Sequence, residues 1–269
     1  MLKKVFLSKL HHIFSQHILR KVPQITLFFW IIKLLTTAMG ESTSDFLVHH
    51  IDPVFAVMIG FAGFALVILL QFWTKKYIPW IYWLAVSMVA IFGTMAADVI
   101  HIVLGIPYFV STIFFAAVLA CVFTLWYKIE KTLSIHSIIT TRRELFYWVA
   151  VITTFALGTA TGDMTAVTFN LGYLGSGVLF AVLFILPLLM QKLAPSNEVL
   201  TFWIAYIFTR PLGASFADWL GRTPDAGGIG FGTGKTSIVL AIFIIMLVGY
   251  LSSLNFLKYN EKRHERDKN

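Results

Sequence analysis

The chain contains a single cysteine and few charged residues for its length. Cys121 lies in an apolar stretch and has no second thiol, which excludes an intrachain disulfide and a thiolate metal site within the chain. Asp, Glu, Lys and Arg make up only 13% of the 269 residues, against roughly 25% in an average soluble domain. This shortage of charge argues against an ordinary soluble domain.

Apolar residues take the place of the missing charges. They make up 58% of the chain, and the mean hydropathy is +0.80. This exceeds what one soluble core can bury, so we expect a lipid bilayer as the solvent. The net charge of +8 would indicate a nucleic-acid partner in a soluble protein. Here the basic residues cluster between apolar stretches, which is typical of membrane topology, and no nucleic acid is expected.

Eight apolar stretches are long enough to cross a bilayer as helices. They comprise residues 25–47, 54–73, 79–103, 108–127, 145–169, 174–190, 199–220 and 236–257. Alternate loops are rich in Lys and Arg, whereas the others hold little charge beyond Asp52, Arg222, Asp225 and Lys235. Because basic loops stay in the cytoplasm, the pattern predicts an all-α, multi-pass protein of the cytoplasmic (inner) membrane with both termini inside.

The two ends of the chain lie outside this membrane domain of residues 25–257. Residues 1–24 form a basic cytoplasmic segment, in which residues 3–20 are expected to lie on the membrane as an amphipathic helix or to be a disordered tail. Residues 258–269 are expected to be a charged cytoplasmic tail. Within the first span, Lys33 is expected to snorkel to the headgroups.

One motif occurs four times: an aromatic residue and Trp, nine residues, Gly, four residues, Asp. The aromatic pairs are Phe29-Trp30, Tyr82-Trp83, Tyr147-Trp148 and Phe202-Trp203. The glycines are Gly40, Gly93, Gly158 and Gly213, and the acids are Asp45, Asp98, Asp163 and Asp218. The spacing indicates four tandem two-helix repeats, at about residues 25–73, 79–127, 145–190 and 199–257.

In this respect the sequence resembles a family of bacterial multi-pass membrane proteins made of four tandem two-helix repeats of unknown function, each with a characteristic tryptophan. The resemblance covers roughly residues 24–257. It implies the eight-helix architecture and no activity, so the chemistry has to come from the residues.

The glycines and tryptophans of the motif are expected to be structural. Because each repeat holds two helices, the four motif helices run parallel at comparable depth. Each Gly and the small residue four positions later form a stripe that lets helices approach closely. The four tryptophans are expected to anchor the helices at the membrane interface. Trp and Asp then lie about 22 Å apart along each helix, which places the acids toward the outer side.

The acids are the candidate ion ligands. A charge inside the bilayer costs at least about 2.5–3.5 kcal/mol, so such residues usually face a cavity, a partner or an ion path. The predicted ion-binding residues are Glu41, Asp45, Asp98, His101, Asp163 and Asp218, flanked by Thr94 and Thr159. Within this set, Glu41, Asp98, His101 and Asp163 could hold a hard or borderline divalent cation. Alternatively, the aspartates mark helix ends at the outer interface or staple neighbouring helices.

Arg210 is the predicted internal counter-charge, because so many carboxylates cannot all stay ionised side by side. It precedes Pro211, which removes a helical hydrogen bond and is expected to kink the helix. The glycine-rich segment 228–236 lacks a phosphate-loop glycine at Ile229 and is interpreted as a flexible outer loop.

Two functions remain open at this stage. The first is transport of a small cation, with a divalent metal or protons as the coupled species, by a carrier or a channel of pseudo-fourfold form. The second is a non-transporting membrane sensor or assembly protein in which the motif serves helix packing. No constellation of serine, cysteine or histidine indicates a hydrolase. Neither an enzyme nor a bound cofactor is therefore expected, beyond a transported divalent cation.

Overall fold

The computed structural model describes residues 20–193 and 197–267, and these residues form helices and no strand. The long helices are α2 (Leu27–His50), α3 (Pro53–Trp73), α4 (Pro79–Asp98), α5 (Tyr108–Glu130), α6 (Thr141–Asp163), α7 (Gly172–Leu193), α8 (Glu198–Gly221) and α9 (Thr233–Asp267). Seven of these eight are long and apolar enough to span a membrane. The eighth, α2, has comparable length but carries Lys33, Glu41 and Asp45.

Local sequence signals set the helix boundaries. Asn197 caps α8 by accepting hydrogen bonds from the backbone N–H groups of Val199 and Leu200, which otherwise have no intrahelical partner. Asp52 caps α3 in the same way, and Pro53 follows it in the first turn, where its missing N–H is not needed. The predicted spans agree with the observed helices to within a few residues, except that α9 ends at Asp267, ten residues beyond the predicted end at residue 257.

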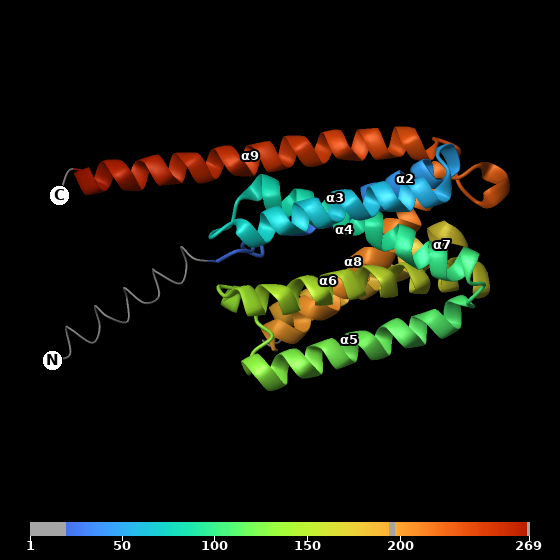
Figure 1. Cartoon of the computed structure of the whole chain (residues 1–269), viewed down its shortest axis with the longest axis horizontal. Helices are drawn as coiled ribbons and strands as arrows, with labels where there is room; N and C mark the ends of the chain where they lie inside the picture. The colour runs from blue at the N-terminus through green and yellow to red at the C-terminus, as the bar shows by residue number, and fades with distance from the viewer. Residues whose placement is uncertain (1–19, 194–196, 268–269) are drawn as a thin grey trace.

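The first helix of every repeat lies inside the bundle, and the second lies outside. More than half of the apolar core segment of α4, α6 and α8 is buried, whereas less than a quarter is buried in α3, α5, α7 and α9. Each outer helix packs mainly on the inner helix of the following repeat: α3 on α4, α5 on α6, α7 on α8, and α9 back on α2 (Figure 1). The last contact closes the four repeats into a ring.

The motif glycines set the spacing of the inner helices. A Cβ added at each glycine would lie within about 3 Å of the residue seven positions after the Trp of the next repeat. The four pairs are Gly40 with Ala90, Gly93 with Phe155, Gly158 with Arg210, and Gly213 with Thr37. Since the same two motif positions meet at every interface, the inner helices run parallel and in register around a pseudo-fourfold axis. The glycines thus have the packing geometry expected of them.

The tryptophans form a buried aromatic ring in place of interface anchors. All four are at most 9% exposed. The aromatic residue preceding each Trp packs on the Trp of the next repeat, with ring centroids 5.6–6.3 Å apart. The pairs are Phe29 with Trp83, Tyr82 with Trp148, Tyr147 with Trp203, and Phe202 with Trp30. The predicted anchoring role is therefore corrected, because the motif turns these rings toward a neighbouring helix and away from lipid.

The described parts of the segments on either side of the membrane domain pack against it or continue its helices. The proposed amphipathic helix falls almost entirely on residues 1–19, outside the described part. From Arg20 the chain docks on the bundle, where Lys21 forms a buried ion pair of 2.5 Å with Glu144. The predicted charged tail continues α9 as far as Asp267, because helical hydrogen bonding persists after the apolar stretch ends. The blue start of the described chain and the end of α9 lie at the same end of the bundle (Figure 1).

Candidate ion site on the bundle axis

One stripe of each inner helix faces the centre of the ring. It comprises the residue before the Trp and those three, seven, eleven and fifteen positions after it, a four-residue spacing that keeps one helix face. The stripes are Phe29, Lys33, Thr37, Glu41 and Asp45; Tyr82, Val86, Ala90, Thr94 and Asp98; Tyr147, Val151, Phe155, Thr159 and Asp163; and Phe202, Tyr206, Arg210, Ala214 and Asp218. All are buried except Asp98 and Asp163, which are half-buried.

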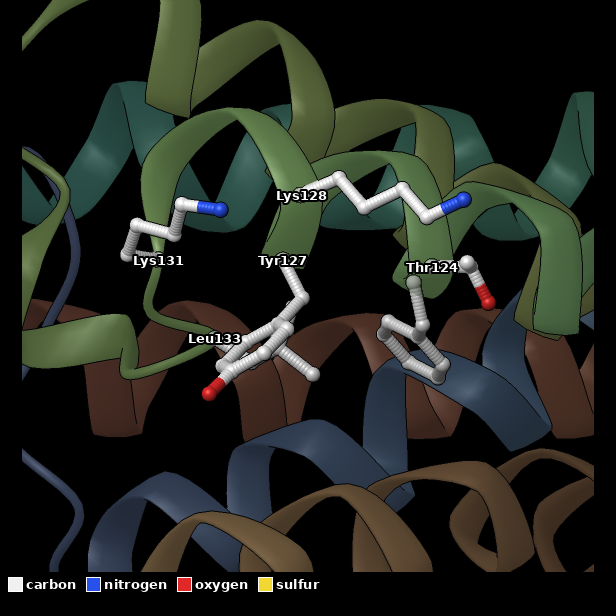
Figure 2. Close-up of a pocket in the computed structure, with 6 residues that line it drawn as sticks. Thr124, Tyr127, Lys128, Lys131 and Leu133 are labelled. Carbon is white, nitrogen blue, oxygen red and sulfur yellow. The ribbon is translucent and has the colours of Figure 1, made fainter.

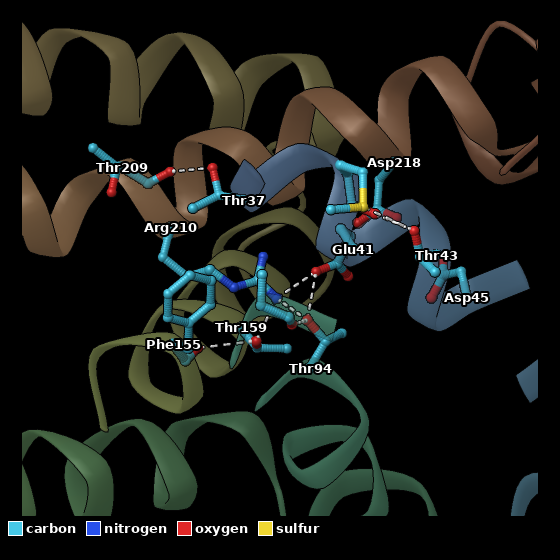
Figure 3. Close-up of polar contacts among 12 residues, drawn as sticks. Thr37, Glu41, Thr43, Asp45, Thr94, Phe155, Thr159, Thr209, Arg210 and Asp218 are labelled. Carbon is cyan, nitrogen blue, oxygen red and sulfur yellow. Dashed lines mark hydrogen bonds and ion pairs between the residues drawn. The ribbon is translucent and has the colours of Figure 1, made fainter. Parts of the chain in front are cut away.

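Arg210 is the hub of the central layer. Its Nη2 donates to Glu41 Oε2 at 2.5 Å, to Thr159 Oγ1 at 2.8 Å, and to Thr94 Oγ1 (Figure 3). These three acceptors occupy the same motif position, eleven residues after the Trp, in the other three repeats. Each threonine hydroxyl donates to a carbonyl four residues back in its own helix, which leaves its oxygen free to accept from Arg210. The ring thus encloses one guanidinium and one carboxylate, which come from the neighbouring helices α8 and α2.

The Arg210 guanidinium is only partly satisfied. Its side chain is 1% exposed, yet Nε and Nη1 have no hydrogen-bond partner in the described part of the chain. Buried donors of this kind are rare in proteins and call for an explanation. The unused N–H groups allow the guanidinium to donate to a further acceptor or to change partners.

Lys33 lies one layer nearer the aromatic ring than Arg210. The prediction that it snorkels to the headgroups is wrong. The residue is 1% exposed, and its Nζ lies 4.0 Å from the centroid of the Phe155 ring and 4.4 Å from that of Tyr206. The Arg210 guanidinium lies over the same Phe155 ring, with its Cζ 5.5 Å from the ring centroid. Lys33 and Glu41 lie on the same face of α2, so the Lys33 side chain points to the bundle axis and not to lipid.

A second ion-paired layer lies at the opposite end of the column from the aromatic ring. Arg222, at the end of α8, contacts Asp218 at 2.8 Å and Asp45 at 3.3 Å. Burial disfavours the charged form of Arg222, but Asp218 and Asp45 outweigh this effect and raise its pKa above the ordinary value. One carboxylate oxygen from each of Glu41, Asp45 and Asp218 lies within 4.8 Å of the others. That spacing suits a cation, since ligands on opposite sides of Ca²⁺ are about 4.6–5.2 Å apart.

Asp98 and Asp163 form the other half of this layer and have no ion-pair partner among the described residues. Both lie close enough to Glu41 and to Arg210 for their charges to interact. A π-helical turn follows each of them, η1 (Val99–Val103) and η3 (Met164–Thr168). Such turns are uncommon and often occur at functional sites. These two aspartates are therefore the carboxylates of the layer that form no direct ion pair among the described residues.

His101 lies apart from the acids. Its Nδ1 is 3.3 Å from Ser111 Oγ, and its ring lies 4.5 Å from that of Tyr108. The predicted metal set of Glu41, Asp98, His101 and Asp163 is therefore replaced by Glu41, Asp45 and Asp218 as the group of described residues with suitable spacing. The prediction assumed an α-helix beyond Asp98, whereas the wider π turn rotates His101 toward α5.

The glycine-rich loop holds the end of α8 and Arg222 in place. Ile229, Gly230 and Phe231 donate backbone hydrogen bonds of 2.8–3.0 Å to carbonyls of Trp219, Arg222 and Leu220. These are carbonyls that a helix end leaves without partners. The loop predicted to be flexible is thus bound to α8.

Gly228→Ala is expected to disturb this arrangement, because a Cβ there would lie 2.1 Å from the Arg222 carbonyl oxygen. We expect a loss of about 1–3 kcal/mol in the free energy of unfolding, measured by denaturant titration in detergent. Gly175→Ala is the matched control, since its Cβ would meet Leu171 at an ordinary 3.5 Å. Equal stability of the two variants would contradict the proposed clash.

Comparison with known proteins agrees with the repeat architecture. The family described as Repeat of Unknown Function (DUF347) matches four segments, residues 28–77, 81–132, 146–195 and 201–255. Each segment begins near the motif tryptophan and contains one inner and one outer helix. No curated protein and no solved structure matches the chain.

Proposed function

Because the chain belongs to the family built from the Repeat of Unknown Function (DUF347), whose description assigns no activity, we propose from its axial residues that it transports a small cation. The observation that carries this proposal is the buried contact of Arg210 with Glu41, Thr94 and Thr159 on the ring axis. It supplies a carboxylate inside the bilayer whose counter-charge is attached to a different repeat and can be exchanged for a cation.

The charge balance of the column favours a cation over an anion. The buried or half-buried acids Glu41, Asp45, Asp98, Asp163 and Asp218 outnumber the basic residues Lys33, Arg210 and Arg222. Charges in the bilayer are costly unless compensated, so the column gains stability from protons or from a divalent metal ion. A cation that enters at Asp98 and Asp163 would compete with Arg210 for Glu41, and this competition couples its binding to a rearrangement of the repeats.

The membrane setting of this proposal follows from the basic loops. We propose that the lysine-rich end of the bundle faces the cytoplasm and that the aspartate layer faces outward across the cytoplasmic (inner) membrane. Under this proposal the chain is a transporter and not an enzyme.

The proposal predicts a loss of transport when the unpaired aspartates are neutralised. The purified chain in proteoliposomes is tested for flux of protons, monovalent cations and divalent metals. Asp98→Asn together with Asp163→Asn is expected to lower the flux of the transported ion at least about tenfold, the effect of losing roughly 1.4 kcal/mol of binding. Asp225→Asn, an exposed aspartate in the outer loop, is the matched control and should keep normal flux.

The packing function remains the alternative because the motif glycines and ion pairs also hold the repeats together. A sensor or assembly protein of this fold would give no flux for any cation above empty liposomes. Cells lacking or overproducing such a protein would also show the same metal sensitivity with the double aspartate variant as with the parent. Those two results together would replace the transport proposal with the packing one.

A further inference from the structure

A second candidate site lies outside the column, where α5 ends at the lysine-rich face of the bundle. An open surface cavity of about 480 Å³ is lined there by Phe123, Thr124, Tyr127, Lys128, Lys131 and Leu133. Figure 2 shows both lysine side chains along one edge of the cavity, with Tyr127 and Leu133 along the other. The cavity thus combines two positive charges with an apolar floor.

The two lysines have no acidic partner among the described residues. The acid nearest in sequence, Glu130, is occupied, since Arg143 contacts it at 2.7 Å and Arg142 also binds it. Lys128 and Lys131 therefore carry charge without an ion-pair partner at the C-terminal end of α5. The helix dipole favours each positive charge there, but the two ammonium groups repel one another unless an anion lies between them.

The backbone at Lys131 is one that glycine adopts more readily. Lys131 ends α5 with a φ of 56°, in the left-handed region, and its N–H donates to the Tyr127 carbonyl at 2.9 Å. Glycine is the usual residue at this position of a helix end, because a Cβ is disfavoured there. A lysine at this place adds charge to the cavity at some conformational cost.

The apolar side of the cavity is fixed to the bundle and opens toward lipid. The Phe123 ring packs on Trp203 with centroids 4.8 Å apart, and the Leu133 carbonyl accepts a 2.9 Å hydrogen bond from Trp203 Nε1. Along α5, Leu125 and Ile129 are about half exposed, at 48% and 49%. The cavity is thus positioned at the boundary between the apolar flank of the bundle and its basic loops.

We propose that this cavity binds an anionic phospholipid of the leaflet on the lysine-rich side. The phosphate lies between Lys128 and Lys131, and the upper part of an acyl chain lies along Phe123 and Leu133. Charge complementarity identifies the occupant, because anionic headgroups attract basic residues at the membrane surface and a phospholipid alone supplies both the phosphate and the apolar chain. This inference does not depend on the proposed transport function.

The test measures lipid retention by the purified full-length chain in detergent, using native mass spectrometry after addition of phosphatidylglycerol or phosphatidylcholine. Lys128→Gln with Lys131→Gly is expected to weaken phosphatidylglycerol binding about 30-fold, from roughly one factor of five to six for each lysine. Phosphatidylcholine retention should stay low in both proteins. The matched control is Lys75→Gln with Lys76→Gln, which removes two exposed lysines from a loop on the same face.

Three results would overturn the proposal. They are equal phosphatidylglycerol retention by the parent and the cavity variant, an equal loss in the control variant, and displacement of the lipid by millimolar inorganic phosphate. The single variant Lys131→Gly distinguishes a loss of lipid binding from misfolding. Glycine relieves the positive φ, so the thermal stability of this variant should be unchanged or higher, while its lipid binding should be weaker.

Discussion

Arg210→Met is expected to lower the free energy of unfolding by about 3–5 kcal/mol, the largest single effect in the bundle. The substitution keeps much of the side-chain volume but leaves the Glu41 carboxylate buried without its ion-pair partner, with only the Thr94 hydroxyl at 3.5 Å. Glu41→Met is expected to be destabilising as well, because it leaves the guanidinium with only the hydroxyls of Thr94 and Thr159. Thermal unfolding in a mild detergent, followed by circular dichroism, measures both effects.

The double variant separates a true pair from two independent defects. When both charges are replaced by apolar side chains, neither member of the pair is left buried without the other, so Glu41→Met with Arg210→Met should recover most of the lost stability. If the two losses simply add, the ion pair does not couple the repeats. The double variant should nevertheless transport no cation, since it lacks the exchangeable carboxylate.

Gly40→Ala is expected to have the second largest effect, because it forces two inner helices apart. A Cβ at this position would lie 2.3 Å from the Ala90 Cβ and 2.8 Å from the Ala90 carbonyl carbon. A backbone atom cannot move away by changing rotamer, so α2 and α4 must separate. We expect a loss of about 3 kcal/mol or more, at the upper end for overpacked sites, measured by denaturant titration in detergent.

The same motif position in another repeat gives a graded comparison. At Gly93 the added Cβ would lie 3.1 Å from the Phe155 Cβ and 3.8 Å from its Cγ, both side-chain atoms, so Gly93→Ala should cost less than Gly40→Ala. Gly249→Ala, in an outer helix, would meet the Trp80 ring at an ordinary 3.7 Å and should be neutral or stabilising. An equal loss in all three variants would contradict the idea that close approach of the inner helices sets the effect.

Lys33 was expected at the headgroups although the motif already carried a signal for its place on the axis. The predicted ion ligands stand mainly eleven and fifteen positions after the Trp. Extended back by four residues at a time, the same stripe passes position seven, where the predicted counter-charge Arg210 stands in the fourth repeat, and reaches Lys33 at position three of the first. The hydrophobic pattern alone could not reveal this, because Lys33 near a helix end is more often a snorkelling residue.

Other features depend on contacts between segments far apart in the chain. The tryptophans were predicted to face the interface, since that is the usual place for Trp in a membrane helix. They are buried because each packs on the aromatic residue of the preceding repeat. Similarly, His101 leaves the acidic layer because a π turn replaces the expected α-helix after Asp98.

The sequence by itself determined the membrane setting, the helices and the repeat, because apolar length, basic loops and a fixed motif spacing are local properties that need no partner to be recognised. Only the tertiary structure decided how the ring closes, with α9 on α2, and which carboxylates have a counter-charge. The physical reason is that the four motifs are nearly the same in sequence, but the surroundings of each acid depend on single residues that other repeats bring next to it. Only the fourth repeat carries Arg210 and Arg222, and these two residues form ion pairs with Glu41, Asp45 and Asp218, whereas Asp98 and Asp163 have no ion pair among the described residues.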